Sequence, residues 1–129
     1  MRRITLILVI MGFSFLNLFC QNEKFRTVSV NEFSVFISDP DVTVVDVRTA
    51  GEHAQGYIPG TDFNIDVLEG GYETEVLAKL PKDKPVAVYC RSGNRSKKAS
   101  RILAENGYEV VELGSGFNGW ASSGRDIER

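Results

Sequence analysis

The sequence predicts an α/β protein with a largely parallel sheet, and three observations support this prediction. Short apolar runs alternate along the chain with segments of helical periodicity. The runs at residues 43–47 and 86–89 are rich in valine, as is typical of parallel strands covered on both faces. The composition, 43% hydrophobic and 25% charged, is that of a folded globular chain. A length of 129 residues fits one domain.

The first twenty residues are different in character from the rest of the chain. Arg2 and Arg3 precede an apolar run at residues 4–19, in which 12 of 16 residues are apolar. A short basic start followed by such a run is typical of a secretory signal peptide. As a helix the run would span about 24 Å, less than the ~30 Å hydrocarbon core of a membrane. We therefore expect residues 1–20 to be a signal peptide and the protein to be exported, in a bacterium to the periplasm.

Two alternatives remain open for this segment. It is also compatible with an uncleaved N-terminal membrane anchor, or with a lipoprotein signal that lipidates Cys20. Lipidation ranks second because Phe19 stands where such signals carry a small residue. We take residues 21–25 as a short linker and residues 26–129 as the folded domain.

The strands and helices of this domain can be placed in order. Five strands are expected, at residues 25–28, 43–47, 63–65, 86–89 and 109–113. Two helix starts fit the capping box, in which a hydroxyl residue and a Glu three positions later satisfy each other's free amides. They begin at Ser29 and Thr49. The longest helix is expected at residues 95–106, since its apolar residues share one face and Gly107 follows it.

The chemistry is expected directly after the strand at residues 86–89. Cys90 follows that strand at its carboxyl end, where open α/β sheets bind ligands. The next residues lead into a helix N-terminus, which favours an anion, and Gly93 permits a tight turn there. Arg91 and Arg95 add positive charge, so the thiolate form of the cysteine is favoured. The expected anion-binding loop consists of Arg91, Ser92, Gly93, Asn94, Arg95 and Ser96.

Several other classes of site are not indicated. A lone cysteine is most often an inert, buried apolar residue, but here strand end, glycine, arginines and helix start coincide. His53 is the only histidine, so no zinc site is expected, and no cofactor is indicated. We expect His53 to be a partly exposed helix residue without a catalytic role. The chain carries a net charge of −2 and no basic patch, so nucleic acid is not an expected partner.

The loop at residues 90–96, C-R-S-G-N-R-S, resembles the active-site loop of rhodanese-like sulfurtransferases. Three more motifs of that family follow the family order, and the similarity covers about residues 26 to 128. They are Asp46-Val47-Arg48 with Glu52, Gly56-Tyr57-Ile58-Pro59-Gly60, and Gly116-Phe117-Asn118-Gly119-Trp120. Residues 26–129 are therefore identified as a rhodanese-like domain.

The resemblance implies a three-layer fold, with a central, mainly parallel five-stranded sheet flanked by helices. It implies that Cys90 takes sulfane sulfur from a donor such as thiosulfate, holds it as a persulfide, and passes it to cyanide or a thiol. Arg91 or Arg95 would orient an anionic donor. Asp46 and Arg48 would form a supporting ion pair near the site.

Three positions depart from the family pattern. Tyr57 stands where the family usually has His, Thr61 where it has Ala, and Ser115 where it has Gly. All three lie outside residues 90–96. They therefore bear on the rim of the site and not on the sulfur-binding loop.

Two alternatives to a sulfurtransferase remain open: a cysteine phosphatase or arsenate reductase, and a binding or persulfide-carrier module. Cysteine phosphatases and arsenate reductases place five residues between Cys and Arg, whereas four lie between Cys90 and Arg95. A catalytically weak binding module or persulfide carrier is the other alternative. The expected partners are a small anionic sulfur donor and a thiol or protein acceptor. A membrane is a partner only if the N-terminal segment is retained or lipidated, and a monomer is expected.

Overall fold

The computed structural model describes residues 25–129. The elements in this part of the chain are β1 (Arg26–Val28), α2 (Val30–Ile37), β2 (Thr43–Asp46), α3 (Ala50–Gln55), β3 (Phe63–Asn64), α4 (Tyr72–Lys79), β4 (Val86–Tyr89), α5 (Asn94–Glu105), β5 (Val110–Leu113) and α6 (Gly116–Ser122). The predicted signal peptide, including Cys20, lies outside the described residues. Within residues 25–129, no helix has the length and apolar character needed to cross a membrane.

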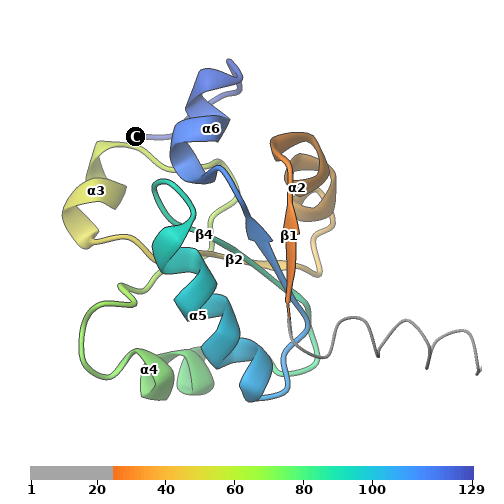
Figure 1. Ribbon diagram of the computed structural model, residues 1–129, viewed down its shortest axis with the longest axis vertical. Coiled ribbons are helices and arrows are strands. Elements are labelled where there is room, and N and C mark those ends of the chain that lie inside the picture. Colours follow the sequence, from red (N-terminus) through yellow and green to blue (C-terminus); the bar gives the residue numbers. More distant parts are fainter. Residues whose placement is uncertain (1–24) are drawn as a thin grey trace, which may run out of the picture.

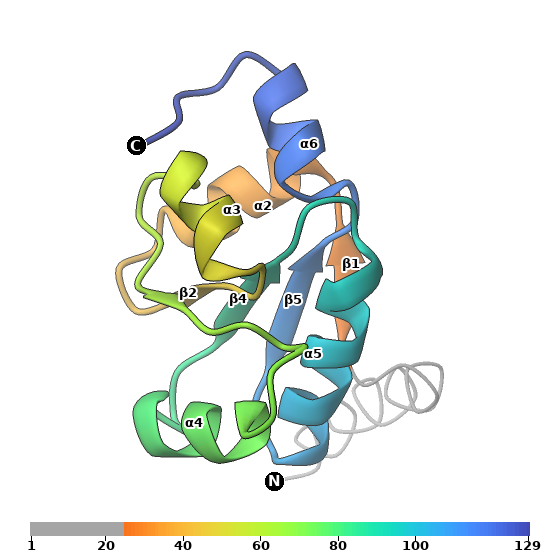
Figure 2. The same ribbon diagram turned by 90° about the vertical axis from the view of Figure 1, so that its left-hand side faces the viewer.

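The strands form one five-stranded sheet in the order β1-β5-β4-β2-β3. Figure 1 shows β1, β2 and β4 of this sheet together with the helices. Every neighbouring pair in this order is parallel. The predicted α/β class and five-stranded parallel sheet are therefore confirmed. Figure 2 shows the arrowheads of β4 and β5 directed toward the end of the molecule where α3 and α6 lie.

The two faces of the sheet carry separate hydrophobic cores. Because successive side chains of a strand point to opposite faces, each central strand contributes to both. Val45 and Val88 belong to the cluster that includes α4 and α5, while Val44 and Ala87 belong to the cluster that includes α2 and α6. The result is a layer of helices on each side of the sheet, as the resemblance implies.

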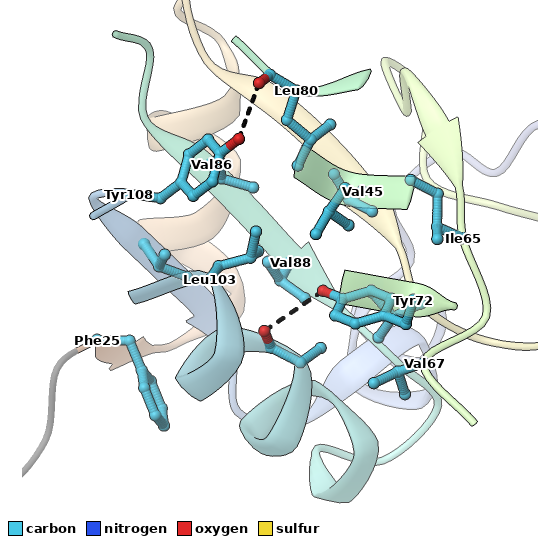
Figure 3. Packing of buried hydrophobic residues seen from close by; sticks show 14 of the residues in the cluster. Phe25, Val45, Ile65, Val67, Tyr72, Leu80, Val86, Val88, Leu103 and Tyr108 are labelled. Carbon is cyan, nitrogen blue, oxygen red and sulfur yellow. Dashed lines mark hydrogen bonds between the residues drawn. The ribbon is translucent and has the colours of Figure 1, made fainter. Parts of the chain in front are cut away.

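Figure 3 shows the first of these cores, where two tyrosines bury their rings and keep a hydrogen bond. The Tyr108 hydroxyl donates to the carbonyl of Leu80 at 2.9 Å, and the Tyr72 hydroxyl donates to the carbonyl of Ala99 at 3.3 Å. Each bond satisfies a polar group that burial would otherwise leave unpaired. Phe25, the last residue of the expected linker, packs into the same cluster.

Both predicted capping boxes are present, at the starts of α2 and α3. The long helix α5 begins at Asn94 and ends at Glu105, one residue earlier at each end than predicted. Its start is fixed by Gly93, which takes a left-handed φ of +104°. The strand at residues 86–89 has the predicted bounds, and each of the other four strands is one residue shorter at one end than predicted. The β2–β4 register ends at Asp46 opposite Tyr89.

Candidate active site

Cys90 lies directly after β4, and its side chain is only 1% exposed. The backbone N–H of Gly93 donates to the Cys90 Sγ at 3.0 Å. The Ser96 Oγ lies 3.5 Å from the same sulfur. Two residues of the predicted anion-binding loop, Gly93 and Ser96, therefore meet at the Cys90 sulfur, and a backbone amide is the closer of the two groups.

Gly93 makes this arrangement sterically possible. Its φ of +104° is in the region that residues with a Cβ rarely adopt. A Cβ at this position would lie 2.2 Å from the carbonyl oxygen of Gly114. The turn that aims the Gly93 amide at sulfur therefore depends on glycine, as the sequence predicted.

The amino end of α6 holds the other side of the loop. The amide of Phe117 donates to the carbonyl of Cys90 at 2.8 Å, and the amide of Asn118 donates to the carbonyl of Arg91 at 3.0 Å. Gly116 permits this contact, since a Cβ there would lie 2.4 Å from the Arg91 oxygen. The motif at residues 116–120 therefore anchors the Cys90 loop, although α5 and β5 separate the two in the sequence.

The two loop arginines have different environments. Arg95 forms a double hydrogen bond to Glu52, with Nη1–Oε1 at 2.7 Å and Nη2–Oε2 at 2.9 Å. These bonds lower the pKa of Glu52 to about 2, and they raise the pKa of Arg95. Arg91 is 63% exposed and its Nη1 lies 3.9 Å from Glu52. Glu52 therefore largely balances the charge of Arg95, and Arg91 is the more available of the two to an approaching anion.

The ion pair expected between Asp46 and Arg48 is present and buried. Arg48 donates from Nε at 2.9 Å and from Nη2 at 2.6 Å to the two carboxylate oxygens. It also donates to the carbonyl of Gly56 at 2.7 Å, and its guanidinium lies 4.4 Å from the ring centre of Phe117. Burial lowers the pKa of Arg48, but the hydrogen bond and charge of Asp46 outweigh it and raise the pKa.

His53 has a contact that the sequence did not indicate. Its Nδ1 lies 2.9 Å from Asp46 Oδ2, and its ring stacks on Tyr57 at 4.3 Å between centroids. Tyr57 stands where the family usually has His, so this stack is a local feature of the rim. Tyr57 lies beyond the end of α3, so the spacing between His53 and Tyr57 did not predict the stack.

A pocket of about 210 Å³ opens beside the loop. Its lining draws on four sequence motifs and consists of Arg48, Glu52, Gln55, Gly56, Arg91, Phe117 and Asn118. Ser92 and Asn94 of the loop are exposed, whereas Cys90 is buried. Within residues 25–129, no three His, Cys, Asp or Glu side chains are grouped so that they would hold a metal ion.

Sequence reasoning missed one charged residue next to the loop. Glu112 on β5 is 0% exposed and accepts a hydrogen bond from the Ser96 hydroxyl at 2.5 Å. In the sequence it stands within the apolar run at residues 109–113. A glutamate in a buried strand needs a hydrogen-bond or charge partner, because burying an unpaired carboxylate is costly. Its place in the apolar run was therefore the available sequence signal.

The family model, the related sequences and the solved structures that match this chain agree on one family. A family model described as a rhodanese-like domain matches residues 29–123. A sulfurtransferase of Allochromatium vinosum is 40% identical over 90 residues, which is 67% of this chain and 78% of that protein. The thiosulfate sulfurtransferase GlpE of Shewanella oneidensis is 30% identical over 98 residues, 75% of this chain and 93% of that protein. The crystal structure of a rhodanese-related protein from Thermoplasma volcanium aligns with a TM-score of 0.67 at 29% identity, covering 81% of this chain and 98% of that one.

Proposed function

The chain belongs to the rhodanese-like domain family, and from this premise we propose that it is a sulfurtransferase with Cys90 as its nucleophile. It moves sulfane sulfur from a small anionic donor, such as thiosulfate, to cyanide or a thiol. The observation that carries the proposal is the Gly93 amide, which donates to the Cys90 sulfur at 3.0 Å. An amide in this position stabilises negative charge on sulfur without a metal. Relatives named as sulfurtransferases support the same reaction class.

The proposed reaction has two displacement steps at sulfur. The Cys90 thiolate attacks the outer sulfur of thiosulfate, the S–S bond of the donor breaks, and its electron pair leaves with sulfite. The enzyme then carries a persulfide on Cys90. Cyanide attacks the outer sulfur of that persulfide, and the electron pair of the breaking S–S bond returns to Cys90 as thiocyanate leaves. The two steps balance without an oxidant or a reductant.

The surroundings of the loop favour a particular kind of donor. Because Cys90 is almost fully buried, a small donor that presents a terminal sulfur atom is favoured. The exposed guanidinium of Arg91 is placed to attract the anionic end of such a donor. Arg95 would act mainly by holding α5 against Glu52.

The loop disfavours the phosphatase and arsenate reductase alternatives. Its four residues between Cys90 and Arg95 make a smaller ring than the five those enzymes use. In addition, Glu52 already occupies both terminal nitrogens of the Arg95 guanidinium. An oxyanion would have to displace that carboxylate to bind Arg95.

A paired activity assay tests the proposed function. Purified protein is expected to form thiocyanate from thiosulfate and cyanide, and the Cys90→Ala variant is expected to form none. A phosphatase assay with p-nitrophenyl phosphate runs in parallel. Phosphate release that disappears in Cys90→Ala, without thiocyanate formation, would overturn the proposal in favour of a phosphatase. Absence of both activities would overturn the proposal in favour of a binding or persulfide-carrier module.

We also propose that the protein is exported and acts as a monomer. The basic start and apolar run of residues 1–20 support export. Cell fractionation with intact-mass measurement tests this, because cleavage is expected to remove about twenty residues. Recovery in the membrane fraction would instead support the anchor or the lipidated Cys20. Size-exclusion chromatography tests the oligomeric state.

A further inference from the structure

A buried carboxylate lies behind the Cys90 loop, outside the motifs that carry the family resemblance. Glu112 on β5 is 0% exposed and is held by donors from two other elements. Its Oε1 accepts from the Ser96 hydroxyl at 2.5 Å. Its Oε2 accepts from the Thr27 hydroxyl at 2.6 Å and from the Lys97 ammonium at 3.0 Å. Lys97 is the one partner of the three that can only donate, and it places a positive charge beside the carboxylate.

The Ser96 hydroxyl connects this carboxylate to the Cys90 sulfur. A serine hydroxyl has one proton to donate. Three acceptors lie around Ser96 Oγ, namely Glu112 Oε1 at 2.5 Å, the Gly93 carbonyl at 3.2 Å, and the Cys90 sulfur at 3.5 Å. The carboxylate is both the closest and the charged acceptor, so it takes the proton. Ser96 is then left with lone pairs, and not a proton, facing sulfur.

We propose that Glu112 is a positioning residue that turns Ser96 into a hydrogen-bond acceptor toward the Cys90 sulfur, so that Ser96 favours the thiol over the thiolate. The inference deepens the proposed function, since the sulfur concerned is the proposed nucleophile. In the thiol form the Cys90 S–H donates to Ser96, and Ser96 donates to Glu112. When the thiolate forms, its proton leaves to solvent, and the Gly93 amide is the donor that remains on sulfur.

The charged groups around this relay act from several elements. Lys97 on α5 pairs with Glu112 and also donates to the Gly93 carbonyl at 3.3 Å, so it links the carboxylate to the loop backbone. The charge of Arg95 acts on the Cys90 sulfur. Lys97 and Arg95 favour negative charge, whereas Glu112 opposes it at sulfur. The relay therefore sets how readily the thiolate forms.

The Glu112→Gln variant tests the direction of this effect. Lys97 can only donate, and it contacts Oε2, so the glutamine carbonyl is expected to take the Oε2 place and the glutamine amide the Oε1 place. That amide then donates to Ser96 and frees the Ser96 proton. The acceptors left to that proton are the Gly93 carbonyl and the Cys90 sulfur, and the sulfur is the charged one once the thiolate forms. Thiolate formation is measured by its ultraviolet absorbance across pH, with Cys90→Ala as the blank. The midpoint is expected to move to lower pH by about one unit. An unchanged or higher midpoint would overturn the inference.

A second variant keeps the inference testable if Glu112→Gln does not fold. In Ser96→Ala the thiol loses its acceptor, so the midpoint is not expected to rise. A rise would mean that Ser96 donates to the thiolate, which contradicts the proposal. In the double variant, the shift caused by Glu112→Gln is expected to vanish. If the full shift persisted without Ser96, Glu112 would act by charge alone and the relay would be wrong.

Thr27→Val is the matched control. It removes one donor to Glu112 and keeps the bond to Ser96, so the midpoint is expected to stay within experimental error of the wild type. A shift equal to that of Glu112→Gln would show a general disturbance of β5 and would contradict the relay. The readout requires no sulfur transfer. A chain that titrates as expected but forms no thiocyanate would refute the proposed function and leave this inference standing.

Discussion

At Cys90 the closest donor to sulfur is a backbone amide, and the charged side chains of the loop lie further out or are already paired. A backbone amide is held in place by the fold, so it needs no reorganisation when charge develops on sulfur. The amide is placed by the turn at Gly93. That turn is possible because Gly93 has no Cβ that would clash with the carbonyl of Gly114. The reactivity of the thiol therefore rests on the packing of one glycine.

Gly93→Ala is expected to abolish most of the sulfurtransferase activity and to lower stability. The added Cβ would lie 2.2 Å from the Gly114 carbonyl oxygen, so the loop must move and carry its amide away from sulfur. Gly107→Ala is the matched control, because Gly107 has a similar φ of +91° and open space around it. It is expected to cost about 1–2 kcal/mol of stability, the cost of a Cβ in the left-handed region, while activity is kept. Thiocyanate formation and thermal unfolding of both variants measure this, and equal activity losses would contradict the account.

Arg91→Ala is expected to raise the KM for thiosulfate several-fold and to leave the Tm unchanged, because the side chain is 63% exposed. Arg95→Ala is expected to lower the Tm, because it leaves the Glu52 carboxylate without its partner. Lys98→Ala removes an exposed charge from α5 and controls for general electrostatics. Steady-state kinetics and thermal unfolding of the three variants separate these roles. An unchanged KM in Arg91→Ala would show that Arg91 does not attract the donor.

The sequence indicated Cys90 and Gly93 because both follow a predicted strand and precede a predicted helix within a few residues. It did not indicate the partners of Arg95 and Ser96. Glu52 is 43 residues from Arg95, and Glu112 reaches Ser96 only because β5 lies beside β4. Such pairs follow from the tertiary fold, and no spacing in the sequence encodes them.

At the scale of elements, a helix was predicted where the sequence carried a capping box or an apolar face. Helices α2 and α3 were predicted because a side-chain hydroxyl and a glutamate mark their starts. Helix α5 has no side-chain cap hydrogen bond, and it was predicted from its apolar face and from Gly107. Helices α4 and α6 also have no such bond, and they were not predicted. Helix α6 also begins at Gly116 and contains Gly119, both poor helix formers. Its contacts with the Cys90 loop hold it in place, and these are tertiary.

The pair between Glu52 of α3 and Arg95 of α5 makes stability depend on pH. Arg95 lowers the folded-state pKa of Glu52 to about 2, compared with an ordinary value of 4.5. Because the folded value is the lower one, the pair stabilises the folded state above about pH 4.5. That contribution is lost as the pH falls from about 4.5 toward 2.

Glu52→Gln is therefore expected to be less stable than the wild type at neutral pH and to show a flatter loss of stability between about pH 4.5 and 2. Urea unfolding at a series of pH values measures both quantities. Glu75→Gln is the matched control, since Glu75 forms an exposed pair with Lys79 within α4 and is expected to contribute little. An identical pH dependence in wild type and Glu52→Gln would contradict the assigned role of the pair.

At the scale of the whole molecule, the parallel sheet brings distant parts of the chain to one end. The carboxyl ends of β2 and β4 meet there with α3, the start of α5 and the start of α6 (Figure 2). The alternation of strands and helices predicted the α/β class, and the family resemblance supplied the five-stranded sheet. The strand order β1-β5-β4-β2-β3 was not predicted, because periodicity along a strand does not say which strand lies beside it.

The most direct test of the proposed persulfide chemistry is mass spectrometry of the purified protein after exposure to thiosulfate. The peptide that contains Cys90 is expected to gain about 32 Da, the mass of one sulfur atom, and to lose it again when cyanide is added. The Cys90→Ala variant is expected to show no such gain. Absence of the adduct on Cys90 in folded protein, or an equal adduct in Cys90→Ala, would contradict the proposal that this thiol carries the transferred sulfur.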